Sequence, residues 1–147
     1  GGMRKTMALF IAASLLASAI ATAAPATHKD ARKLVRLPTP MRTHMLTNMR
    51  DHLVALHEIQ DALAAGKLDQ AADVAETRIG MSSLATHDAS HMAPYMPQPM
   101  QDIGTAMHHA ASRFARSAHE GDLKKALTDL SGVTQQCVAC HAAYRVQ

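Results

Sequence analysis

Four stretches of this sequence carry small or apolar residues at helical spacing, and two of the three connections between them are very short. The stretches span about residues 40–65, 69–90, 100–119 and 123–145. The short connections are Gly66-Lys67-Leu68 and Gly121-Asp122-Leu123. Long amphipathic helices joined by such loops lie antiparallel to one another. No alternating strand pattern competes, so the sequence predicts an all-α fold, arranged as an antiparallel up-down-up-down four-helix bundle.

Local signals mark the ends of these helices. Thr39-Pro40 predicts an N-cap followed by proline at the first helical position, and Gly66 is typical of a helix end. Asp69 and Asp122 are the expected caps of the second and fourth helices. Three prolines in residues 94–99 interrupt the helical pattern between the second and third helices. The expected inner faces are Met45, Met49, Leu53, Leu56 and Leu63; Ala72, Ala75, Ile79 and Ser82; Ile103, Met107, Ala111 and Phe114; and Leu123, Leu127, Leu130 and Val133.

The first 23 residues have the composition of a secretory signal peptide. Gly1-Gly2-Met3 is interpreted as a cloning remnant joined to the natural start, and it is followed by a basic head, an apolar run over residues 8–21 and a small-residue cleavage site. The apolar run is Ala-rich and short for a membrane span. We therefore expect a periplasmic protein with no membrane contact after cleavage. Residues 24–38 are expected to form a polar leader, and residues 39–147 one helical domain.

Cleavage would also change the charge of the chain. The full sequence holds 15 Lys and Arg against 12 Asp and Glu, and Arg4 and Lys5 leave with the signal peptide. The remaining 13 basic residues give a net charge of only +1. Nucleic-acid-binding domains carry a marked basic excess, so nucleic acid is not expected as a partner.

The only two cysteines of the chain lie three positions apart and are followed directly by a histidine, in the run Cys137-Val138-Ala139-Cys140-His141. A redox dithiol would call for a βαβ setting, and a zinc site would need further ligands at suitable spacing. Neither context is present. The pattern Cys-x-x-Cys-His is typical of c-type haem attachment, so we expect one covalent haem c on Cys137 and Cys140, with His141 binding the iron.

In an antiparallel bundle, the end of the last helix lies beside the start of the first. A second iron ligand is therefore expected within about residues 41–49. The candidates there are Met41, His44, Met45 and Met49. Met45 is preferred because it shares the expected inner face with Met49 and lies nearer the haem end. Ligation by one methionine and one histidine raises the reduction potential of a haem.

The motif Cys137-x-x-Cys140-His141-x-x-Tyr144-Arg145, at the end of four helical stretches, resembles the class II c-type cytochromes, which include cytochrome c′ and cytochrome c-556. The resemblance implies a four-helix bundle with one covalent haem near the C-terminus, the histidine of the motif as proximal ligand, and often a homodimer. Relatives of cytochrome c-556 place a methionine of the first helix on the iron. Those of cytochrome c′ leave this position open behind an apolar residue.

That resemblance keeps a second register open. The family commonly places an arginine four residues before the distal position, and Arg42 stands four residues before Leu46. In this register, Leu46 faces a five-coordinate iron that binds NO or CO. In either register, Arg42 and Arg145 are candidates to pair with a haem propionate.

A second group of residues has no role in that scheme. It consists of His87, His91, Met92, Met96 and Met100, which surround the proline-rich connection. Imidazole and thioether groups suit Cu(I), so a copper site is a further hypothesis. His108-His109 carries less weight, because neighbouring positions on a helix diverge by about 100°.

Nothing in the chain indicates an enzyme. The sequence has no inner pair of carboxylates, no phosphate-binding loop and no nucleophile elbow. The preferred function is that of an electron carrier that meets other redox proteins in transient contacts. A gas-binding protein that uses Leu46 and a periplasmic copper protein are the alternatives.

Overall fold

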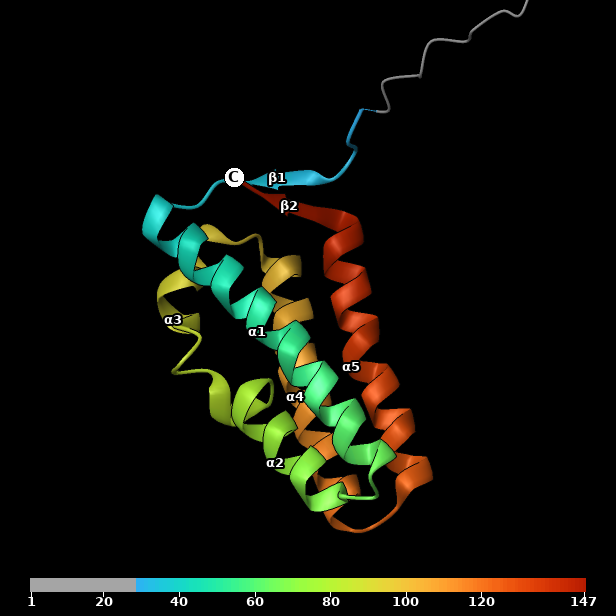
Figure 1. The fold of residues 1–147 in the computed structure, drawn as a ribbon. Coiled ribbons are helices and arrows are strands. Elements are labelled where there is room, and N and C mark those ends of the chain that lie inside the picture. The colour runs from blue at the N-terminus through green and yellow to red at the C-terminus, as the bar shows by residue number, and fades with distance from the viewer. Residues whose placement is uncertain (1–28) are drawn as a thin grey trace, which may run out of the picture.

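The computed structural model describes residues 29–147 and confirms a predominantly helical protein (Figure 1). The expected signal peptide lies outside the described residues. In chain order the elements are β1 (Lys33–Val35), α1 (Thr39–Ala64), α2 (Leu68–Arg78), the 3-10 helix η1 (Met81–Ser83), α3 (Ala89–Met92), the 3-10 helix η2 (Ala93–Tyr95), α4 (Gln98–His119), α5 (Leu123–Ala143) and β2 (Tyr144–Val146). Over residues 29–147, no helix combines the length and apolar character that a membrane span requires.

The helices pack in a chain of neighbours. α4 packs against both α5 and α2, and α2 packs against α1. Phe114, Ile59 and Ile79 are the largest side chains of the main core, and most of their buried neighbours are alanines. Small side chains let helix backbones approach closely, which explains how so few aromatic residues suffice for this core.

The expected turn signals are confirmed at Gly66, Gly121 and Asp122, whereas the prediction for Thr39 was wrong, since Pro38 holds the N-cap position of α1 without a side-chain cap. Gly66 and Gly121 adopt φ values of +69° and +76°, a conformation that favours glycine. Asp122 caps α5, because its side chain accepts a hydrogen bond of 2.9 Å from the Lys125 backbone N–H. The prediction for Asp69 was wrong, since Lys67 holds the N-cap position of α2 without a side-chain cap and Asp69 lies in the first turn.

α2 ends at Arg78, well before the end expected near residue 90. The backbone becomes extended at Gly80, where an added Cβ would lie 2.6 Å from the Glu76 carboxylate. Only glycine fits this close approach, so the helix ends here and the chain continues through short turns. Ser82 is consequently exposed, whereas Ser83 is buried.

The buried faces of α1 and α5 match the expected ones only in part: Met45 and Val133 are buried as predicted, but several leucines are exposed. Leu53 is 71% exposed, and the neighbouring His52 is buried instead. The Asn48 amide donates a 3.3 Å hydrogen bond to the His87 carbonyl, and a His52–His87 contact adds to it. These polar contacts turn this face of the helix inward. On α5, Leu123 and Leu127 are 45% and 50% exposed, and the buried residues are Ala126 and Val133.

Two short strands join the ends of the described chain, although the sequence indicated none. β1 and β2 pair in parallel, with Val35 opposite Val146. Beyond this pair, the Leu37 N–H donates to the Gln147 carbonyl and the Gln147 N–H donates to the Val35 carbonyl, both at 3.1 Å. Part of the expected leader is therefore bound into the fold. The strand pair brings the chain entering α1 and the chain leaving α5 side by side (Figure 1).

Candidate functional site

A second hydrophobic cluster lies apart from the main core and contains six of the ten methionines of the chain. We call it the methionine cluster. Its buried members are Val35, Leu37, Met45, Met92 and Met100, and Met41, Met49, Met96, Cys140, Tyr144 and Val146 pack against them. The strands contribute Val35, Val146 and Tyr144, so the β1–β2 pair forms part of its wall. Side chains from the start of α1 and the end of α5 thus meet in one cluster.

Cys137 and Cys140 lie one turn apart on α5, and both are free and half-buried. Cys137 packs against the main core and Cys140 against the methionine cluster. The Cys137 thiol donates to the Val133 carbonyl at 3.5 Å. Burial raises the pKa of both thiols, so they stay protonated at neutral pH. His141, in the last turn of the helix, is exposed.

The start of α1 offers three kinds of side chain to this end of the molecule. Met45 is 8% exposed and belongs to the same cluster as Cys140. Met41 and Met49 are partly buried against that cluster. Leu46 is 37% exposed and is not a member of it. His44 is half-buried, and its Nε2 atom is buried without a hydrogen-bond partner.

The two candidate arginines differ in their surroundings. Arg145 lies on β2, where its Nε atom is 3.5 Å from a carboxylate oxygen of Asp30 and is buried without a hydrogen bond. Arg42 lies in the first turns of α1 and is half-buried. Both are near the strand pair in the chain, so both could reach an anionic group bound at this end.

The structure divides the proposed copper ligands between two places. Met92, Met96 and Met100 share the methionine cluster with Met45. The His87 imidazole instead contacts His52 and Ser83 in the interior, and His91 pairs with Asp88 at the surface. These two imidazoles therefore do not join the three thioethers in one contact set.

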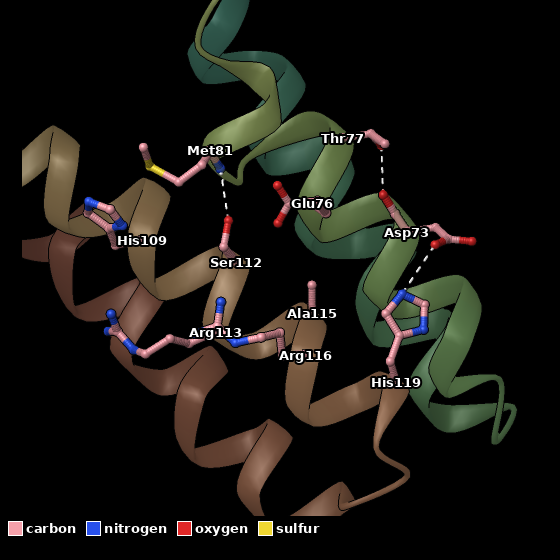
Figure 2. Close-up of a pocket in the computed structure, with 10 residues that line it drawn as sticks. All are labelled: Asp73, Glu76, Thr77, Met81, His109, Ser112, Arg113, Ala115, Arg116 and His119. Carbon is pink, nitrogen blue, oxygen red and sulfur yellow. Dashed lines mark hydrogen bonds and ion pairs between the residues drawn. The ribbon is translucent and has the colours of Figure 1, made fainter.

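A groove of about 560 Å³ lies between α2 and α4, away from the cysteines (Figure 2). Its walls carry both acidic and basic side chains, and His119 spans two aspartates, with Nδ1 3.0 Å from Asp69 and Nε2 3.4 Å from Asp73. The Ser112 hydroxyl accepts a 2.9 Å hydrogen bond from the Met81 N–H. Arg113, Arg116 and His109 also line the groove.

Sequence reasoning missed two features of the interior. The first is β1, whose three residues are too short to show a strand period. The second is a set of buried histidines, His52, His87 and His108, which come from separate parts of the chain. One sequence signal could have indicated this set: Asn48 and His52 are four residues apart, so both polar side chains lie on the same face of α1.

No family model, curated protein or solved structure matches this chain.

Proposed function

We propose that this protein is a periplasmic mono-haem cytochrome of the class II c type that carries single electrons. Cys137 and Cys140 would bind the haem covalently, His141 would be the proximal ligand and Met45 the distal one. The observation that carries the proposal is that Cys140 and Met45, 95 positions apart in sequence, pack in one cluster.

The donor set fits a haem. Two free thiols stand at the spacing of c-type attachment, and the exposed His141 is free of core packing. The six methionine side chains of the methionine cluster are flexible and adapt to a bound group more easily than branched ones. The haem would supply an iron that exchanges one electron. The chain would hold both iron ligands, limit access of water and so set the potential.

The proposal includes the antiparallel four-helix arrangement. It is supported by the two tight glycine turns and by the contacts of α4 with α5, α2 with α4 and α1 with α2. In this arrangement, the haem would bind at the end of the bundle that carries the parallel β1–β2 pair. Val138 is 68% exposed between the two cysteines, and would give a redox partner an apolar contact beside the haem.

A second distal ligand is favoured by one observation. The buried Nε2 of His44 has no hydrogen-bond partner, and an iron bond would satisfy it. Leu46 gains no such support, because it is 37% exposed and lies outside the methionine cluster. The choice is thus between methionine and histidine ligation, which differ in reduction potential.

The test is an optical spectrum of the reduced protein, produced together with haem maturation machinery. We expect sharp, split α and β bands from a six-coordinate low-spin haem. Met45→Leu should convert them to a broad high-spin spectrum, whereas the matched control Met49→Leu should keep them. If Met45→Leu leaves the bands sharp and His44→Leu abolishes them, the histidine is the ligand.

Covalent attachment is tested separately by haem staining after denaturing electrophoresis. The double variant Cys137→Ser, Cys140→Ser should lose the stain, because no thiol remains to bind the vinyl groups. A wild-type protein that stays colourless under these conditions would refute the proposed function as a whole.

A further inference from the structure

Three histidines from three separate segments meet in the protein interior. His52 lies on α1, His108 on α4, and His87 in the connection between η1 and α3. They are 6%, 8% and 6% exposed, respectively. Their ring centroids are 4.7 Å apart for His52–His87, 5.4 Å for His87–His108 and 6.5 Å for His52–His108. We call this set the histidine triad.

Hydrogen bonds fix the protonation of two of the rings. The Ser83 hydroxyl donates to the Gly80 carbonyl at 2.7 Å, so it accepts from His87 Nδ1 at 3.2 Å. His108 Nδ1 donates to the Ile79 carbonyl at 2.5 Å. A neutral imidazole with its proton on Nδ1 has a lone pair on Nε2. Histidines that bind metals are oriented by such Nδ1 contacts to carbonyl and hydroxyl oxygens.

The third ring, His52, completes the set. Its Nε2 lies 3.3 Å from the Nε2 of His87. Because His87 Nε2 carries the lone pair, His52 Nε2 donates the hydrogen bond between them. Two nitrogens bound at about 2.0–2.1 Å to one tetrahedral ion are about 3.3 Å apart, so this pair already has the separation of two metal ligands.

We propose that the histidine triad binds one divalent late transition-metal ion through its Nε2 atoms. Rings around a tetrahedral ion have centroids about 5 Å apart, which the His87–His108 pair nearly matches. As the side chains stand, no three His, Cys, Asp or Glu residues in the described part of the chain could hold an ion. To bind an ion, the His52 ring must therefore approach His108 by about 1 Å and change to the neutral tautomer that carries its single proton on Nδ1, which frees the Nε2 lone pair.

The electrostatic surroundings suit a cation. Burial, followed by the neighbouring imidazoles, lowers the pKa of His52 to about 4, and burial lowers the pKa of His87 and His108 as well. The three rings are thus neutral at pH 7 and have lone pairs to give. Asp51 is adjacent to His52, and Asp51 and Glu58 share one cation, Arg78. Of these charges, Asp51 favours a cation at His52, whereas Arg78 opposes it.

The ligand type identifies the class of ion. Imidazole suits Zn²⁺, Cu²⁺ and Ni²⁺, whereas Mg²⁺ and Ca²⁺ prefer oxygen ligands. No side chain of the haem proposal belongs to the triad, so the inference does not rest on that proposal. A site that binds Zn²⁺ would tie α1, α4 and the η1–α3 connection together.

The experiment titrates Zn²⁺ into the purified protein after treatment with chelator, by calorimetry at pH 7.5. We expect one Zn²⁺ per chain with sub-micromolar affinity. The variants His52→Gln and His108→Gln should each weaken binding at least tenfold. Matched controls are His57→Gln and His109→Gln, exposed histidines on the same two helices, and His119→Gln, which removes the surface His–Asp contacts; all three should bind like wild type.

A second measurement needs no variant. The zinc X-ray absorption fine structure of the wild-type complex should show imidazole nitrogens in the first shell. Zn²⁺ binding with a dissociation constant above about 10 μM would overturn the proposal. Loss of binding in His119→Gln, or a sulfur ligand in the first shell of the zinc, would overturn it as well. The triad would then be a buried hydrogen-bonded network.

Discussion

Acid should destabilise this protein through the histidine triad, and His52 allows the effect to be worked out. Its pKa is lowered from 6.5 to about 4, first by burial and then by repulsion from His87 and His108. A lowered pKa means that the folded state favours the neutral ring. The resulting stabilisation is complete above pH 6.5, and it is lost as the pH falls from 6.5 toward 4.

The magnitude follows from the two pKa values. Between pH 8 and pH 5, the unfolded chain takes up nearly a full proton at His52, whereas the folded chain takes up about a tenth of one. The linkage integral gives a loss of about 2 kcal/mol at pH 5, and the limit well below pH 4 is about 3 kcal/mol. Domains of this size are stable by only about 5–15 kcal/mol, so the loss is a substantial share.

The assay is urea unfolding of the purified protein at pH 8 and pH 5, with a chelator present to exclude metal ions. His52→Gln keeps an amide that donates to His87 but does not titrate, so this variant should lose about 2 kcal/mol less than wild type over that range. His57→Gln is the control, because His57 is exposed on the same helix beside Asp61. Equal losses in wild type and His52→Gln would refute the burial argument.

Two further outcomes follow from contacts at the ends of elements. Asp122→Ala removes the cap of α5 and should lower the free energy of unfolding by about 1 kcal/mol, measured by urea unfolding, whereas Asp122→Asn should cost much less because the amide oxygen still accepts from Lys125. Gln147→Pro removes the N–H that donates to the Val35 carbonyl and should lower the free energy of unfolding by about 1 kcal/mol. Under the haem proposal, this variant should also broaden the α and β bands. An unchanged free energy of unfolding would show that the strand pair does not hold the two ends together.

Local signals predicted much of the fold because they act over a few residues. Gly66 and Gly121 mark turns that need positive φ, and Asp122 caps a helix with an atom three residues from its partner. Both kinds of signal depend only on the backbone conformation of residues within one helical turn. The helix ends therefore lie within a few residues of their expected positions, apart from the end of α2.

Long-range contacts decided the rest, and the sequence does not reveal them. Leucine spacing predicted that Leu53 faces the core, yet His52 does so because Asn48 and His52 find partners around His87. A buried polar group is stable only when its partner is present. Since His87 lies 35 positions from His52, the pattern on α1 alone could not predict the choice.

β2 gives the six residues after His141 a role in the candidate site. An antiparallel bundle alone leaves two helices free to slide, and a shift of one turn, about 5.4 Å, would change which of Met41, Met45 and Met49 lies nearest to Cys140. The pairing of Val35 with Val146 sets one register between the start of α1 and the end of α5. Three residues separate β1 from α1, and β2 follows α5 directly. The strand register therefore restricts how far the two helices can shift along each other. Under the haem proposal, the terminal strand pair would then determine which methionine of α1 binds the iron, and β2 would take part in the ligand geometry.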